Sequence, residues 1–390
     1  MSSLEEFYQQ VRASKPMEPI VLRDPIPLEE LHTPALLIDL DVFAANLERM
    51  QEFLNDHSMT LRAHTKMHKC PVIARQQIEK GATGVCAAKI SEAEIMCDAG
   101  IEDVLVTSPI ITIEKVRRFI DLRKNNEGLK IVVDNERSVQ LLDEMATAEG
   151  LVLDVFVDLD PGMGRTGIEC GDAAVALCDT VGESKSLRFS GLQMYAGNCM
   201  HIEGFEKRRD KYCHVMEKGA ATLAMILAAG IEVPVFSGGG TGTYNIEPGL
   251  GLVNELQAGS YAFMDIEYRD IGGVNTSQFL DFQVSLFVLV TAISQPQSRL
   301  ITVDAGFKSF ASDKMAPQFR DVEGVIFHWG GDEHGMIQLD NPSREIKLGN
   351  KLPMITPHCD PTVNLHDYYF PYRDGMVCEI WPISARGLSN

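Results

Sequence analysis

The sequence has no apolar run that approaches the roughly 20 residues a membrane-spanning helix needs. Its longest apolar stretch, residues 284–293, is about as long as a β-strand. The first 19 residues carry charges and lack an apolar core, which a secretory signal would require. We therefore expect neither a membrane protein nor an N-terminal secretory signal.

Basic charge is also scarce. Lys and Arg total 35 against 55 Asp and Glu, so the formal net charge is −20. Proteins that bind nucleic acid or anionic membrane surfaces depend on basic side chains, so we expect neither partner. The nine cysteines are scattered and form no CxxC pair. This distribution is typical of reduced thiols in the cytoplasm and argues against a disulfide framework.

Short apolar runs alternate with helical patterns through the first part of the chain. Eight β–α units in one array predict a (β/α)₈ TIM-like barrel, although the periodicity alone leaves a doubly wound sheet open. The eight runs are residues 35–40, 60–63, 84–88, 103–106, 130–133, 153–158, 189–194 and 233–236.

The pattern changes after about residue 265, where helical periodicity ends and short strand-like runs follow. We predict three parts. Residues 1–30 form an N-terminal arm that packs with the β domain, residues 31–268 form the barrel, and residues 269–390 form a C-terminal β-rich domain.

Chemistry in a barrel concentrates at the C-terminal ends of the strands. Lys66 follows the second run, where apolar surroundings would favour a nucleophilic amine; a solvated basic loop is the alternative. Arg165 lies in a glycine-rich turn after the sixth run and offers a rigid donor fork. Residues Ser237–Thr243 follow the eighth apolar run and contain four glycines. The backbone N–H groups of such a segment suit a phosphate; a flexible loop is the alternative.

A second polar cluster lies in the β-rich part, at residues 357–362. If this segment is extended, His358 and Asp360 point the same way and Cys359 points the other way. His358 and Asp360 are competent ligands for a divalent cation, although a structural role is also open. The cluster at 332–335 (DEHG) has the same ambiguity. An amine, a phosphate-binding glycine run and an arginine together suggest pyridoxal 5′-phosphate.

The chain resembles the D-threonine aldolase family, which is related to D-3-hydroxyaspartate aldolases and eukaryotic-type D-serine dehydratases. These are pyridoxal phosphate enzymes with an alanine-racemase-like barrel. Seven motifs in order carry the resemblance: HTKMHK at 64–69, GMGRTG at 162–167, GLQMY at 191–195, GGGTGTY at 238–244, ELQAGSYAFMD at 255–265, DEHG at 332–335 and PHCDPTVNLHD at 357–367.

The resemblance implies a role for each matching residue. Lys66 would bind the cofactor aldehyde as a Schiff base, Arg165 would contact the cofactor's phenolic oxygen, and Tyr195 would lie beside its ring. The phosphate would be held by Gly239, Gly240, Thr241, Gly259 and Ser260. His358 and Asp360 match the metal ligands. The dehydratases have His-x-Cys there, so an aspartate favours Mn²⁺ or Mg²⁺ while Zn²⁺ stays possible.

The implied reaction is a retro-aldol cleavage of a D-3-hydroxy amino acid, such as D-threonine, to glycine and an aldehyde. His64 or a water on the metal would remove the hydroxyl proton. A D-3-hydroxyaspartate aldolase that releases glyoxylate, a D-serine or 3-hydroxyaspartate dehydratase, and a non-enzymatic pyridoxal phosphate homeostasis protein are the alternatives. The family also implies a homodimer, and we expect a cytoplasmic protein.

Overall fold

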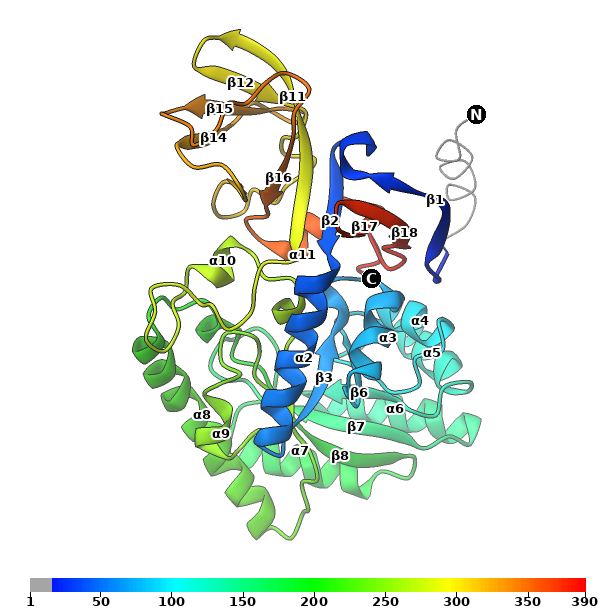
Figure 1. The fold of residues 1–390 in the computed structure, drawn as a ribbon. Helices are drawn as coiled ribbons and strands as arrows, with labels where there is room; N and C mark the ends of the chain where they lie inside the picture. Colours follow the sequence, from blue (N-terminus) through cyan, green and yellow to red (C-terminus); the bar gives the residue numbers. More distant parts are fainter. Residues whose placement is uncertain (1–15) are drawn as a thin grey trace.

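The computed structural model describes residues 16–390. It consists of a barrel, in the lower part of Figure 1, and a β-rich region above it. Eight parallel strands close the barrel in the order β10-β3-β4-β5-β6-β7-β8-β9, which confirms the predicted barrel architecture. These strands are β3 (Thr60–His64), β4 (Gly84–Ala87), β5 (Val104–Val106), β6 (Leu129–Val133), β7 (Leu153–Asp158), β8 (Leu187–Met194), β9 (Phe236–Gly238) and β10 (Glu255–Leu256).

Amphipathic helices surround the barrel. In α6 (Glu136–Glu149), the Asn135 side chain accepts a hydrogen bond from the Ser138 N–H at the start, and Gly150 adopts the left-handed conformation at the end. The others in this region are α2 (Leu40–Asp56), α3 (Pro71–Glu79), α4 (Ile90–Asp98), α5 (Ile113–Arg123), α7 (Asp172–Glu183), α8 (Phe205–Ala228), α9 (Glu247–Leu250) and α10 (Ile266–Arg269). The side chains of Asp39 and Thr112 cap the starts of α2 and α5 in the same way.

One predicted barrel strand belongs elsewhere. The sequence predicts residues 35–40 as the first barrel strand, but β2 (Ala35–Asp39) pairs with β11 and β17 in the β-rich sheet, so this prediction is wrong. A strand buried on both faces gives a continuous apolar run in either setting. The barrel therefore begins at β3, and its eighth strand is β10. With only two residues, β10 is too short to show a hydrophobic periodicity.

The β-rich region is built on a sheet with the strand order β1-β18-β17-β2-β11-β12-β15-β14, and β16 pairs with both β11 and β13. Its strands, other than β2, are β1 (Ile20–Pro27), β11 (Leu286–Gln297), β12 (Leu300–Val303), β13 (Gln318–Phe319), β14 (Val325–Trp329), β15 (Gly335–Leu339), β16 (Lys351–Ile355), β17 (Tyr368–Arg373) and β18 (Met376–Pro382). The sequence analysis assigns the residues of β1 to an N-terminal arm and does not identify β13 or β17 as strands. A short helix, α11 (Cys359–Val363), lies between β16 and β17.

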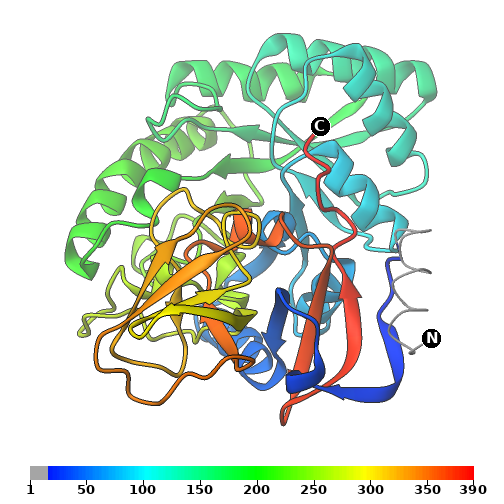
Figure 2. The same cartoon turned by 90° about the horizontal axis from the view of Figure 1, so that it is seen from above.

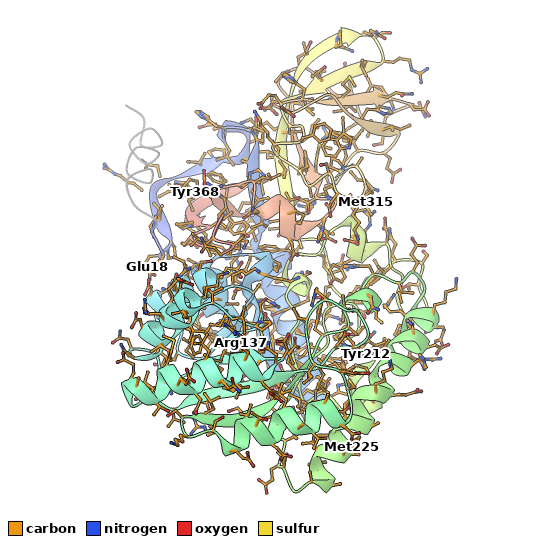
Figure 3. All side chains as sticks on the ribbon, turned by 180° about the vertical axis from the view of Figure 1, so that it is seen from behind. Glu18, Arg137, Tyr212, Met225, Met315 and Tyr368 are labelled. Carbon is orange, nitrogen blue, oxygen red and sulfur yellow. The ribbon has the colours of Figure 1, made fainter. Side chains whose placement is uncertain are left out.

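The N-terminal segment lies along the C-terminal strands. β1 pairs antiparallel with β18, and residues 1–15 of the predicted arm lie outside the described residues. Glu18 reaches the barrel, where its carboxylate pairs with Arg75 of α3 at 2.6 Å (Figure 3). Seen from above, the β-rich region covers one side of the barrel (Figure 2). No helix within residues 16–390 has the length and apolar character needed to cross a membrane.

Candidate active site

Lys66 follows the first barrel strand directly. It lies in a single 3₁₀ turn (Thr65–Met67), which Thr65 anchors by donating to the Cys86 carbonyl at 2.8 Å. The Lys66 Nζ lies 3.4 Å from Oδ1 of Asp360, at the start of α11. The Asp360 carboxylate raises the pKa of Lys66, and this ion pair lowers the pKa of Asp360. The barrel and the β-rich region therefore meet at Lys66 and Asp360.

His64 ends the strand and points into the same region. Burial lowers the pKa of His64 to about 3, so its imidazole is neutral at neutral pH. Its Nδ1 accepts the Lys66 backbone N–H at 3.4 Å, and its Nε2 lies 3.4 Å from Oγ1 of Thr107. His64 therefore lies next to Lys66 as an uncharged ring.

The GMGRTG turn is held by its own aspartate. Oδ1 of Asp160 accepts the backbone N–H groups of Gly162 at 2.9 Å, Met163 at 2.8 Å and Gly164 at 3.2 Å. These three N–H groups therefore stabilise the turn itself. The Arg165 guanidinium lies 5.5 Å from the centre of the Tyr195 ring. Tyr195 in turn borders the glycine run, because a Cβ at Gly240 would lie 3.4 Å from its ring.

The predicted phosphate-binding residues follow the seventh and eighth barrel strands, where phosphate sites in such barrels are common. The hydroxyl of Thr241 accepts the Tyr261 N–H at 2.9 Å and so ties the glycine run to the Gly259–Ser260 turn. Within residues 16–390, the backbone N–H groups of Thr241, Gly242 and Ser260 donate to no protein acceptor. The barrel end thus offers unpaired donors on buried backbone.

Glycine is needed in this region for close packing. A Cβ at Gly240 would lie 2.9 Å from the Met200 sulfur, and one at Gly259 would lie 2.7 Å from the His64 carbonyl oxygen. A side chain at Gly240 would therefore press against Met200, and one at Gly259 would press against the backbone of His64. Local packing therefore keeps the predicted phosphate-binding residues close to Tyr195 and His64.

The segment with His358 and Asp360 is not extended throughout, so that part of the prediction is wrong. His358 is extended, but it caps the short helix α11, in which Asp360 occupies the first turn. Even so, Nε2 of His358 lies 4.0 Å from Oδ2 of Asp360. Cys359 is fully buried, and burial raises the pKa of its thiol.

Two further acids surround His358, and the sequence analysis missed them. Its Nδ1 lies 2.9 Å from Oδ2 of Asp313 and 3.9 Å from Oε2 of Glu267. Glu267 also pairs with Lys314 and lies 3.5 Å from Nδ1 of His201. Glu267 belongs to α10, Asp313 and Lys314 to one loop and His201 to another, and they share no motif. Across the described part of the chain, no group of three or more His, Cys, Asp or Glu side chains is arranged to hold a metal ion.

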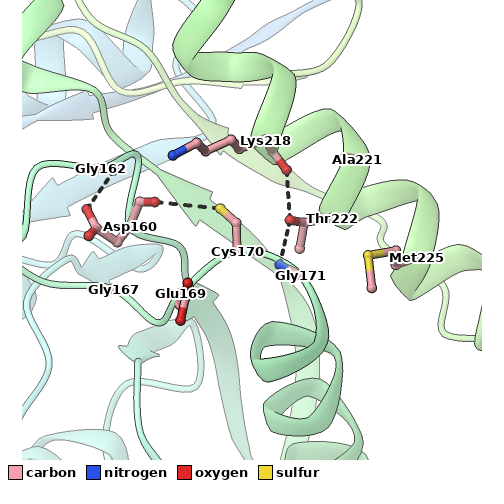
Figure 4. Close-up of a pocket in the computed structure, with 10 residues that line it drawn as sticks. All are labelled: Asp160, Gly162, Gly167, Glu169, Cys170, Gly171, Lys218, Ala221, Thr222 and Met225. Carbon is pink, nitrogen blue, oxygen red and sulfur yellow. Dashed lines mark hydrogen bonds between the residues drawn. The ribbon is translucent and has the colours of Figure 1, made fainter.

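Two other polar regions lie apart from these residues. Asp332, Glu333 and His334 are exposed in the loop between β14 and β15, where Glu333 pairs with Lys308. A cavity of about 640 Å³ lies between the Asp160 turn and α8 (Figure 4). Asp160, Glu169, Cys170 and Lys218 line it, and none of the predicted site residues does.

Comparison with known proteins identifies the family of this chain. Residues 38–267 match the family described as "Alanine racemase, N-terminal domain", and residues 285–372 match a "Putative serine dehydratase domain". The chain is 36% identical over 365 residues to a D-threonine aldolase from Arthrobacter sp., covering 93% of this chain and 95% of the relative. It is 35% identical over 362 residues to a 3-hydroxy-D-aspartate aldolase from Paracoccus denitrificans (strain Pd 1222), covering 92% and 93%.

The fold agrees as well. The crystal structure of a D-threonine aldolase from Filomicrobium marinum superposes with a TM-score of 0.90 at 36% identity, covering 95% of this chain and all of that one. Both the sequence matches and this superposition extend over the barrel and the β-rich region. The chain therefore belongs to the alanine-racemase-like enzymes, in the family that contains the D-threonine aldolases and the 3-hydroxy-D-aspartate aldolases.

Proposed function

We propose that this protein is a pyridoxal-phosphate-dependent and divalent-cation-dependent aldolase. It cleaves D-3-hydroxy amino acids of the D-threonine type to glycine and an aldehyde. The observation that carries the proposal is the 3.4 Å contact between Lys66 of the barrel and Asp360 of α11. This contact brings a candidate cofactor amine next to a candidate cation ligand, and the reaction needs both.

The residues at the barrel end fit pyridoxal phosphate. Unpaired buried N–H groups at Thr241, Gly242 and Ser260 suit a phosphate, and an amine at Lys66 suits an aldehyde. Bound there, the cofactor would supply an electron sink for the electron pair released at Cα when the Cα–Cβ bond breaks. Tyr195, whose ring borders the glycine run, and Arg165 beside it would contact the cofactor there.

The residues at α11 fit a hard divalent cation. Mg²⁺ and Mn²⁺ are commonly held by only one or two protein side chains, with waters completing the shell, so a two-residue site does not need a third side chain. His358 and Asp360 provide a nitrogen and an oxygen 4.0 Å apart, and a carboxylate oxygen ligand favours Mg²⁺ or Mn²⁺ over Zn²⁺. A cation there would polarise the substrate β-hydroxyl and lower its pKa.

Two further side chains, Asp313 and His64, have roles in this proposal. Asp313 contacts Nδ1 of His358 and so directs Nε2 toward Asp360. The neutral His64 ring is the candidate acceptor for the hydroxyl proton; its unprotonated nitrogen is Nδ1, which accepts the Lys66 N–H, so this contact must open for the proton transfer. Its low pKa makes it a weak base, so it would act only on a hydroxyl that the cation has already acidified.

We infer selectivity for one configuration at Cα from the two-part site, and the names of the relatives identify that configuration as D. With a cofactor held at Lys66, only one Cα configuration would direct the hydroxyl-bearing carbon toward His358 and Asp360. The other configuration loses both the cation contact and the orientation, a loss on the order of several kcal/mol. Selectivity at Cβ should be looser, because exchanging its substituents still leaves a hydroxyl near the cation.

An assay with a panel of substrates tests the proposal. The protein loaded with pyridoxal phosphate and Mn²⁺ is given D-threonine, L-threonine, D-threo- and D-erythro-3-hydroxyaspartate, and D-serine. We expect glycine and acetaldehyde from D-threonine and none from L-threonine. Faster cleavage of a 3-hydroxyaspartate to glycine and glyoxylate would assign the natural substrate to that compound. A 2-oxoacid with ammonia as the main product from D-threonine would refute the aldolase assignment and indicate a dehydratase.

We further propose a cytoplasmic homodimer. All nine cysteines are free, which is consistent with a reducing compartment. The homodimer rests on the resemblance to the family. Sedimentation of the purified protein at several concentrations would test it, and a monomer at micromolar concentration would contradict it.

A further inference from the structure

Arg208, in the first turn of α8, is fully buried. Its guanidinium donates to four backbone carbonyls: Gly242 at 2.8 Å, Ile202 at 2.8 Å, Gly272 at 2.9 Å and Ile271 at 3.0 Å. It also lies 5.8 Å from the ring centres of Phe205 and Phe279. One side chain therefore joins three segments that are distant in the sequence.

The charge of this arginine has no acidic partner. Within residues 16–390, no carboxylate forms an ion pair with Arg208. Asp281 interacts with it electrostatically but accepts its hydrogen bonds from Tyr244 at 2.7 Å and Asn245 at 3.4 Å. An arginine stays protonated in a protein, so this is a buried positive charge whose direct contacts are carbonyl dipoles and aromatic rings, with no carboxylate bound to it. Such a charge is costly unless something else compensates it.

The position of the charge suggests what compensates it. Gly242, whose carbonyl accepts from Arg208, belongs to the turn that offers unpaired N–H groups at Thr241 and Gly242. A Cβ at Gly242 would clash with the Met200 carbonyl, so only glycine fits there. Arg208 therefore holds, through the Gly242 carbonyl, the same turn that has unpaired N–H donors at the barrel end.

We propose that Arg208 is a positioning residue for the cofactor phosphate: it holds the glycine-run turn from behind, and its unpaired charge favours a phosphate dianion in front of that turn. The inference rests on the proposed function, because it takes this turn as the phosphate site. Arg208 acts through Gly242 and does not touch the phosphate. A purely structural role would also explain the four hydrogen bonds, so the test must separate the two.

Pyridoxal and pyridoxal 5′-phosphate provide that separation, because they share the ring and the aldehyde and differ in the phosphate. The measured quantity is the ratio of their dissociation constants for the cofactor-free protein, from equilibrium titration followed by protein fluorescence. Arg208→Gln removes the charge, and Arg208→Lys keeps it with fewer donors. We expect Arg208→Gln to reduce the preference for the phosphate ester by about tenfold or more, and Arg208→Lys to keep it within about threefold.

Arg62 offers a matched control. It is also a buried arginine in the barrel, but it pairs with Glu255 at 2.9 Å and with Asp103. Arg62→Gln should destabilise the protein while leaving the preference for the phosphate ester unchanged. A change in this preference that is equal in Arg62→Gln and Arg208→Gln would show a general effect of destabilisation and would overturn the proposal.

The other outcomes are equally decisive. A wild-type protein that binds pyridoxal phosphate no better than pyridoxal would refute the phosphate site and the proposed function with it. A wild-type preference that Arg208→Gln retains, or that Arg208→Lys loses as fully as Arg208→Gln, would overturn only the role of Arg208. If the neutral variant does not fold, ³¹P NMR of the wild-type holoenzyme can still overturn the proposal. A bound phosphate that stays dianionic well below pH 6 is expected, and titration near its ordinary second pKa of about 6 would contradict the proposal.

Discussion

Glu247, at the start of α9, is a buried acid whose charge state should control stability. It is fully buried, accepts a hydrogen bond from the Tyr212 hydroxyl, and lies so close to the glycine run that a Cβ at Gly239 would clash with its Oε1. Burial raises the pKa of Glu247 from 4.5 to about 8. Glu247 is therefore protonated in the folded protein at neutral pH but ionised in the unfolded chain.

The direction of the pH dependence follows from proton binding. Between about pH 4.5 and 8 the folded state holds one more proton at this site than the unfolded state, so its contribution to the free energy of unfolding falls as the pH rises. The slope approaches about 1.4 kcal/mol per pH unit over this window. The stabilisation is fully present below the unfolded pKa and is lost as the pH rises through the folded pKa. The total over the window is on the order of 5 kcal/mol.

Glu247→Gln removes this slope, because an amide cannot ionise and still accepts from Tyr212. Urea unfolding of the wild type and of Glu247→Gln, at about pH 5.5 and about pH 7.5, measures how the free energy of unfolding of each protein changes with pH. We expect the wild type to lose about 2–3 kcal/mol more than Glu247→Gln between these pH values. Other buried acids, such as Asp158, also make stability depend on pH. They contribute equally to both proteins, so their contribution cancels when the two pH dependences are subtracted. Glu217→Gln, an exposed acid on α8, serves as a control and should behave as the wild type. Identical slopes in the wild type and Glu247→Gln would refute the assignment of a protonated Glu247.

Three further predictions concern the proposed reaction. Lys66→Ala should lose the visible absorption of a Schiff base and all measurable turnover; a fully active Lys66→Ala would rule out this lysine. Chelation by EDTA should abolish cleavage reversibly while the cofactor stays bound, and His358→Ala should behave like the chelated wild type; undiminished activity after dialysis against EDTA would exclude the cation. Gly240→Val should weaken pyridoxal phosphate binding, because its Cβ would lie 2.9 Å from the Met200 sulfur, and equilibrium titration would reveal an unchanged affinity if this packing argument is wrong.

The barrel could be predicted because each β–α unit leaves its own local pattern in the sequence. The assignment of residues 35–40 failed because a strand buried on both faces looks the same in a barrel and in the middle of a mixed sheet. Only pairing with β11 and β17 distinguishes them, and both partners lie more than 240 residues away. The two-residue strand β10 has too few positions to show any pattern.

The site residues also differ in whether a local sequence pattern marks them. Lys66, the glycine run and the pair His358 and Asp360 belong to contiguous motifs, so the sequence could point to them. The turn of helix after His358 was missed, although Pro361 and Asp360 in its first turn are typical of a helix start. No local signal marks Arg208, because its role depends on carbonyl groups from three segments that only the folded chain brings together.

The contact between Lys66 and Asp360 is fixed by hydrogen bonds on both sides of it. The Tyr369 hydroxyl of β17 donates to the His68 carbonyl at 2.8 Å, and the Ala385 N–H donates to the Lys69 carbonyl at 3.0 Å. The Cys359 N–H, at the start of α11, donates to Oδ2 of Asp265 at 2.7 Å. These bonds join the backbone next to each partner across the boundary between the barrel and the β-rich region. The amine and the candidate cation ligands are thus held in register by buried backbone before any ligand binds, as a reaction that uses both at one substrate requires.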